Sequence, residues 1–174
     1  MTADTSNQPQ QTLALVYAAL LMRLWLAVRA IQTGIEKFAG TKAATDVVSI
    51  DGQPNEYGLT AGGSVKFYSS ENYHGVPEAL MGKFKAEPLM LKWALPVYDM
   101  ILGPLLLALG INILIGLASR TSLFLLGLLY ISLTWGLILI KQDEGVSWLG
   151  VHMILIGMAL ALSQYNRFTV LKKW

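Results

Sequence analysis

The chain has 174 residues, enough for one domain, and 54% of them are hydrophobic while only 14% are charged. Soluble domains carry about 25% charged residues, so this composition excludes a surface that mostly faces water and indicates an integral membrane protein. The net charge of +2 is too small to indicate binding to nucleic acid. The absence of cysteine excludes disulfides, thiolate metal sites and iron–sulfur clusters.

The first predicted element is a membrane-spanning helix from about Leu13 to Ile35. Residues 1–11 are polar and lack the basic segment that opens a signal peptide. The apolar run is also too long for a cleaved signal and matches the roughly 20 residues that span a bilayer. We therefore expect this helix to be retained.

The polar segment of residues 40–94 is expected to lie outside the bilayer. Two β-rich pieces within it, Thr45–Asp51 and Ser64–Ser70, flank several glycines and predict a small hairpin. Proline in the first turn and Pro88 after the last turn predict a short helix over Pro77–Ala86. Its apolar residues share one side, which suits a helix at the membrane interface. A disordered loop is the alternative.

Three further apolar runs predict the remaining spanning helices: Leu95–Leu117, Leu123–Ile140 and Ser147–Tyr165. Short polar turns separate them, so consecutive helices are expected to run antiparallel. The sequence thus predicts an all-α membrane protein, a single domain over residues 1–174 built as a four-helix antiparallel bundle. Pro104 in the second span lacks an N–H group and is expected to kink it, which either opens the outer half of the bundle or affects only packing.

Basic residues near the helix ends are divided almost evenly between the two sides of the membrane. Long loops cross a membrane largely regardless of charge, so the basic cluster in residues 167–173 has the greater weight. It predicts that both termini lie in the cytoplasm and the long loop in the periplasm, across a bacterial-type inner membrane.

Four ionisable residues interrupt the apolar spans: Arg23, Arg29, Asp99 and His152. A charge at the centre of a span costs about 2.5–3.5 kcal/mol on insertion scales, so each one requires a reason. At about 1.5 Å per residue, Arg29 lies roughly 9 Å and Asp99 roughly 6 Å from the outer helix ends. His152 and Trp135 lie roughly 7–8 Å from theirs. Each predicted helix therefore places one polar residue or indole in a single layer beneath the loop.

This layer is the predicted site. Arg29 and Asp99 can neutralise each other and still leave donors for an anion or a carbonyl group. His152 can relay a proton, since imidazole titrates near neutral pH, and Trp135 can form a wall for a flat ring. The alternative is that Arg29 snorkels outward, Trp135 belongs to an interfacial belt and His152 satisfies a hydrogen bond in the core.

Arg23 lies near the middle of the first span, on one helical stripe with Ala27, Ala30 and Gly34. Small residues let a second helix approach closely, so this stripe is expected to face the bundle. Tyr130 lies at a similar depth and is a candidate partner of Arg23. A structural tie between helices is favoured over a catalytic role.

Two sets of spaced residues indicate a family. In the first span an arginine, a small residue, a glycine and a lysine occur in that order: Arg23, Ala27, Gly34 and Lys37. The second span and the turn after it supply an acid, two glycines and a basic residue: Asp99, Gly103, Gly110 and Arg120. Together with the ending at residues 165–168 (YNRF), these motifs resemble the DoxX/DoxD family of small four-helix membrane proteins. The resemblance covers the helices and not the long loop.

The resemblance implies membrane redox chemistry, because DoxD is the quinone-linked subunit of thiosulfate:quinone oxidoreductase. We therefore expect a quinone-interacting subunit of a respiratory-type oxidoreductase, with quinone as its cofactor. The residues expected to act in catalysis are Arg29, Asp99 and His152. Those expected to bind the quinone are Trp135, Lys37 and Tyr98.

Other cofactors and partners follow from what the spans contain. A single intramembrane histidine excludes a bis-histidine haem, and no iron–sulfur or other metal site is expected within this chain. Membrane lipid and other subunits of a membrane complex are the expected partners, without nucleic acid. The alternatives to a catalytic subunit are a non-catalytic accessory subunit and, less favoured, a small-molecule transporter.

Overall fold

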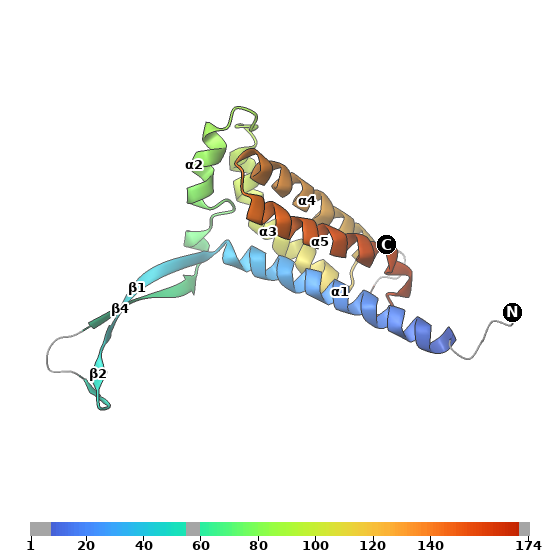
Figure 1. Ribbon diagram of the computed structural model, residues 1–174, viewed down its shortest axis with the longest axis horizontal. Helices are drawn as coiled ribbons and strands as arrows, with labels where there is room; N and C mark the ends of the chain where they lie inside the picture. Colours follow the sequence, from blue (N-terminus) through green and yellow to red (C-terminus); the bar gives the residue numbers. More distant parts are fainter. Residues whose placement is uncertain (1–7, 55–59, 171–174) are drawn as a thin grey trace.

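The computed structural model describes residues 8–54 and 60–170, and this part of the chain is mostly helical. It contains five α-helices, of which four are long and apolar enough to cross a membrane. The predictions of a mostly helical chain and of four helices of spanning length are therefore confirmed. A small β-ribbon projects from one end of the long helices (Figure 1).

The four long helices follow the predicted spans with shifted ends. They are α1 (Gln8–Glu36), α3 (Leu95–Ile115), α4 (Ser119–Leu139) and α5 (Asp143–Ala161). α5 begins earlier than predicted, because Asp143 and Glu144 stabilise the positive N-terminal end of the helix. A short 3-10 helix, Ser163–Tyr165, replaces its predicted last turn.

Gly116 closes the turn between α3 and α4 in the left-handed conformation, with a φ of 75°. Its N–H group donates to the Ile113 carbonyl at 3.3 Å, and the Leu117 N–H group donates to the Asn112 carbonyl at 2.8 Å. These two bonds form a Schellman motif, which satisfies carbonyls at the end of a helix. The chain can therefore reverse within a few residues.

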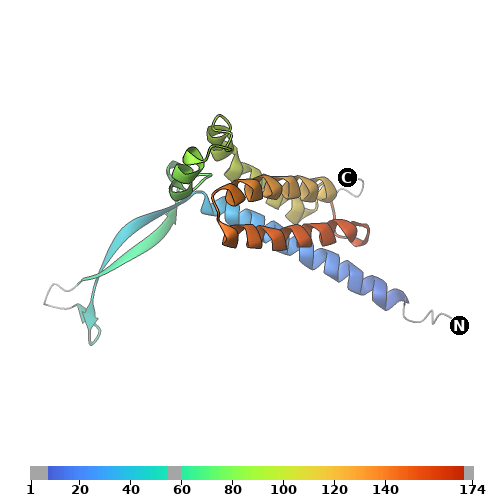
Figure 2. The same cartoon turned by 45° about the horizontal axis from the view of Figure 1, so that its top comes forward.

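The four long helices lie side by side (Figures 1 and 2), with α1 against α3, α4 against α5, and further contacts between α3 and α4 and between α1 and α5. Ala27 and Ala30 are fully buried, so the predicted small-residue stripe of α1 does face the other helices. A Cβ atom on Gly110 would come within 3.1 Å of the Ala27 carbonyl oxygen, so glycine lets α3 approach α1 closely here. The largest fully buried side chains are Leu26, Leu102, Leu106, Ile113 and Leu126.

Large hydrophobic side chains also cover the outside of the long helices. Exposed examples occur on all four: Leu21, Trp25, Met100, Phe124, Ile131 and Ile154. Soluble proteins rarely expose extended apolar patches, whereas lipid solvates them. The four apolar helices are therefore compatible with a multi-pass membrane protein.

The β-ribbon follows α1 directly. β1 (Ala39–Val47) pairs antiparallel with β4 (Thr60–Tyr68), and β2 (Ser49–Ile50) pairs antiparallel with β3 (Gln53–Pro54). The ribbon lies in the region of the predicted hairpin, but its long strands begin several residues earlier than predicted. An ion pair between Lys66 and Glu36 joins the ribbon to the last turn of α1.

The short helix α2 (Glu78–Ala86) lies where a helix was predicted. It follows Pro77, whose fixed φ angle suits the start of a helix. Its Phe84 is buried and packs with Val76 and Leu95 in a second, smaller core. α2 therefore covers the end of the long helices from which the ribbon projects (Figure 1), which we call the outer end.

Candidate functional site

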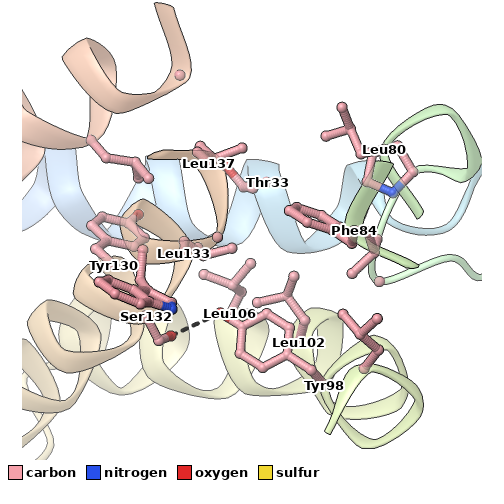
Figure 3. Close-up of a pocket in the computed structure, with 18 of the residues that line it drawn as sticks. Thr33, Leu80, Phe84, Tyr98, Leu102, Leu106, Tyr130, Ser132, Leu133 and Leu137 are labelled. Carbon is pink, nitrogen blue, oxygen red and sulfur yellow. Dashed lines mark hydrogen bonds between the residues drawn. The ribbon is translucent and has the colours of Figure 1, made fainter. Parts of the chain in front are cut away.

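A cavity of about 450 Å³ lies at the outer end, between the four long helices and α2. Its walls are mainly apolar, with Leu80 and Phe84 from α2, Leu102 and Leu106 from α3, and Leu133 from α4. Figure 3 shows Phe84 pointing from α2 toward the side chains of α3 and α4. The volume suits a small organic molecule, since ligand cavities typically measure about 300–1,000 Å³.

The cavity brings together polar and aromatic residues that the sequence pattern singled out. Six of them line it: Arg29, Lys37, Tyr98, Tyr130, Trp135 and His152. Lys37 directly follows α1, and the other five lie within the long helices. Arg23 and Asp99 are not part of the lining. Of the four residues in the predicted layer, Arg29, Trp135 and His152 line this cavity and Asp99 does not.

Asp99 does not pair with Arg29 in the described part of the chain, so the predicted ion pair is wrong. Its Oδ1 atom accepts a hydrogen bond from the Val76 N–H group at 2.6 Å, while Arg29 donates to Gln32 Oε1 on its own helix at 2.6 Å. The loop reaches Asp99 because Gly75 has no side chain: a Cβ atom there would lie 1.9 Å from the Asp99 carbonyl oxygen. Asp99 therefore holds the loop in place.

Lys37 lines the cavity just beyond the end of α1. Burial lowers the pKa of its ammonium group, and the negative charge of Asp99 offsets only part of this effect. No ion pair holds the ammonium group within the described residues. It can therefore serve an oxygen atom of a bound molecule.

A loop tyrosine, Tyr73, contacts the backbone of α3 just before Pro104 and shares its one hydroxyl hydrogen between two carbonyls. Pro104 has no N–H group, so the Met100 carbonyl four residues earlier lacks its helical donor. The Tyr73 hydroxyl lies 2.9 Å from that carbonyl and 2.7 Å from the Asp99 carbonyl, and it accepts from the Gly103 N–H group at 3.1 Å. The loop is thus joined to α3 through the helix backbone as well as through the Asp99 carboxylate.

His152 is buried, with 6% of its surface exposed, and its own helix sets its orientation. Nδ1 lies 2.8 Å from the Trp148 carbonyl oxygen, which can only accept, so Nδ1 carries a proton. In the neutral imidazole, Nε2 then holds a lone pair. The hydrogen bond from Nδ1 agrees with the alternative that His152 satisfies a hydrogen bond in the core. It leaves Nε2 without a partner in the chain's own helix.

Tyr130 packs against His152, with ring centroids 5.7 Å apart and planes at 90°. Only 4% of Tyr130 is exposed, yet its hydroxyl group is not among the enclosed, unpaired side-chain atoms of the described residues. Because Tyr130 lines the cavity, this hydroxyl can donate to a molecule bound there. His152 and Tyr130 form a polar part of an otherwise apolar wall.

Tyr98 and Ser132 join α3 to α4 beside the cavity (Figure 3). Their hydroxyl oxygens are 2.8 Å apart, and Ser132 Oγ also lies 2.7 Å from the Leu129 carbonyl oxygen. Because the carbonyl can only accept, the serine proton goes to it and Tyr98 donates to Ser132. This bond holds the Tyr98 ring in the cavity wall.

Arg23 is hydrogen-bonded to the segment after α5 and not to Tyr130, so its predicted partner is wrong. Its Nη1 atom donates to Asn166 Oδ1 at 2.6 Å and to the Phe168 carbonyl at 2.5 Å. This segment folds back over the end of α3 because Gly116 leaves room: a Cβ atom there would lie 2.9 Å from the Phe168 carbonyl oxygen. Arg23 is 4% exposed and joins two parts of the chain, as expected for a structural residue.

Several lining residues were not predicted as site residues: Thr33, Leu80, Phe84, Ser132 and Trp148. Helical spacing could have indicated two of them, since Thr33 lies four residues from both Arg29 and Lys37, and Trp148 lies four residues before His152. Helical spacing gives no indication of Leu80 and Phe84, because nothing in the loop sequence determines which of the long helices α2 covers.

Comparison of the chain with protein-family models, with curated proteins and with solved structures gives no match. The class of the protein is defined by its fold and its cavity. It is a small helical protein whose described part has four helices apolar enough to cross a membrane. Between their outer ends lies a mainly apolar cavity with a few polar groups.

Proposed function

We propose that this chain is a multi-pass membrane protein that binds a quinone and serves as the quinone-interacting subunit of an oxidoreductase. The observation that carries the proposal is the cavity, which combines an apolar wall with Arg29, Tyr130 and His152. The resemblance of the helices to the DoxX/DoxD family supports the same function. The polar groups suit a quinone head group, and the apolar wall suits its ring and the start of its tail.

Each polar residue has a role that its surroundings allow. Arg29 uses one donor for Gln32 and retains others for a quinone oxygen. His152 would move a proton through Nε2, and Trp135 would face the ring. Bound quinone would supply the two-electron chemistry, and a partner subunit would supply or accept the electrons.

The proposed placement in the membrane puts the outer end toward the periplasm of a bacterial-type inner membrane. α2 and the loop before it then form a lid over the cavity, and both termini lie in the cytoplasm. The basic residues that follow α5 support this orientation, as does the ability of long loops to be translocated. Membrane lipid and other subunits are the partners in this proposal.

A second candidate is a non-catalytic accessory subunit, favoured by the way two of the intramembrane charges are engaged. Arg23 joins the segment after α5 to α1, and Asp99 holds the loop at Val76. Charged residues that fasten parts of a chain together need no substrate. In this reading the cavity is occupied by lipid.

Quinone binding by the purified protein separates the two candidates. The full-length protein in lipid nanodiscs is titrated with a short-chain ubiquinone, and tryptophan fluorescence reports binding because Trp135 and Trp148 line the cavity. We expect Arg29→Gln to weaken binding about tenfold or more, because hydrogen bonds to charged groups contribute about 1.5–3 kcal/mol. Arg120→Gln, at an exposed position near the start of α4, is the control and should bind like the original protein.

The result that would overturn the proposal is equally definite. If no quinone co-purifies with the protein and the titration shows no saturable binding, the accessory role replaces it. Equal affinities of the Arg29→Gln and Arg120→Gln proteins would remove Arg29 from the binding site.

A further inference from the structure

Resting on the cavity function proposed above, we infer that the cavity selects head groups that carry a hydroxyl hydrogen. A phenol, or the quinol form of a quinone, would then bind more tightly than the same ring bearing only carbonyl or ether oxygens. The inference follows from which polar atoms of the wall already have partners and which do not.

The first unmatched group is an acceptor, Nε2 of His152. The Nδ1 proton is used by the Trp148 carbonyl oxygen at 2.8 Å, so the neutral ring offers only the Nε2 lone pair to the cavity. The neutral ring cannot exchange these roles between its nitrogens, because the Trp148 carbonyl oxygen facing Nδ1 requires a donor there. Nε2 is not among the enclosed, unpaired side-chain atoms of the described residues, so a ligand that takes the place of water there must bring a hydrogen.

The second unmatched group is a donor, the hydroxyl of Tyr130. It belongs to a residue that is 4% exposed, lines the cavity and packs against the His152 ring. Arg29 lines the same cavity and retains donors beyond the one that it gives to Gln32. A ligand must therefore also bring an oxygen that accepts.

A single hydroxyl group on the ligand serves both the acceptor and the donors of the wall. Its oxygen accepts from Tyr130 or Arg29 while its hydrogen is donated to His152. A carbonyl or ether oxygen satisfies the donors and leaves the Nε2 lone pair without a partner. Among the described residues that line the cavity there is no aspartate or glutamate, so none of their side chains is a carboxylate that competes as acceptor for the ligand hydrogen. His152 is therefore the residue that distinguishes the two kinds of head group.

The test uses two non-redox probes, 4-nonylphenol and 4-nonylanisole, in which the hydroxyl hydrogen of the first is replaced by a methyl group in the second. Both are titrated into the full-length protein in nanodiscs of phosphatidylethanolamine and phosphatidylglycerol, with empty nanodiscs subtracted for partitioning. We expect the phenol to bind at least about fivefold more tightly, because an unpaired buried polar group carries a substantial penalty. Short-chain ubiquinone and its quinol, compared without oxygen, should show the same order.

Matched variants locate the preference. His152→Phe keeps a flat ring beside Tyr130 and should bring the two affinities to within about twofold, since the acceptor is gone. His74→Phe changes the other histidine of the chain, which is exposed and outside the lining, and should keep the full preference. His152→Gln restores an acceptor oxygen and should keep part of it, so the inference stays testable if the phenylalanine variant does not fold.

Each outcome has a distinct meaning. Equal binding of phenol and anisole by the original protein would overturn the hydroxyl preference while leaving quinone binding intact. A preference that persists in His152→Phe would overturn the role of His152. If neither the probes nor ubiquinone bind, both this inference and the proposed function fall.

Discussion

Arg29 and Asp99 are bonded to Gln32 and to the Val76 N–H group rather than to each other, and they lie at different levels of the neighbouring helices α1 and α3. Gly103 packs against Lys37 and Gly110 against Ile31, so Asp99 lies beyond Lys37 while Arg29 lies near the level of Gly110. Counting residues from the helix ends does not determine how two helices are aligned. The partner depends on what else reaches the side chain, and the loop brings a backbone N–H group to Asp99. A backbone donor is fixed in place, so it binds a carboxylate without ordering a long side chain.

Arg23 allows a test at the same scale. Arg23→Met keeps an unbranched side chain but removes the hydrogen bonds to Asn166 and Phe168. We expect the free energy of unfolding to fall by about 2–3 kcal/mol, because hydrogen bonds to charged groups contribute about 1.5–3 kcal/mol. Unfolding of the micelle-solubilised protein in a dodecyl sulfate titration measures the change.

The control for this prediction is Arg120→Met. Arg120 is exposed, so its replacement should alter the free energy of unfolding by less than about 0.5 kcal/mol. If both arginine variants unfold at the same detergent fraction, Arg23 does not hold the segment after α5.

Among the elements, α3 relies on a residue far from it in the sequence. Pro104 removes one helical hydrogen bond, and the Tyr73 hydroxyl lies within 2.9 Å of the carbonyl that this leaves free. Gly103 and Gly75 make the approach possible, since a Cβ atom at either position would overlap Tyr73 or Asp99. The loop therefore packs against α3 at the place where proline interrupts the hydrogen bonding of the helix.

A double-mutant cycle tests this connection. Tyr73→Phe should lower the free energy of unfolding by about 1–3 kcal/mol, because it leaves a backbone carbonyl without a donor. Pro104→Ala supplies an N–H group for the same carbonyl, so Tyr73→Phe should cost less in that background, with a coupling energy of about 0.5–3 kcal/mol. Tyr17→Phe, at an exposed position on α1, is the control. Strict additivity of the two changes would show that Tyr73 does not serve that carbonyl.

For the whole molecule, the proposed orientation can be tested directly because the chain contains no cysteine. Single cysteines are introduced as Ser64→Cys in β4 and Thr121→Cys near the start of α4, both at exposed positions. We expect a membrane-impermeant maleimide to label the first in intact spheroplasts and the second only after the membrane is opened. The reverse pattern would place the cavity and its lid toward the cytoplasm.

The sequence by itself determined the four helices of spanning length and the buried stripe of Ala27 and Ala30, and it singled out Arg29, Trp135 and His152, which line one cavity. Hydropathy and helical spacing are properties of neighbouring residues, so they can be read along the chain. Only the tertiary structure decided that Arg23 binds the segment after α5, that Asp99 holds the loop, and that α2 covers the cavity. These contacts join residues far apart in the sequence, and they depend on where the loop packs and where glycines allow close approach.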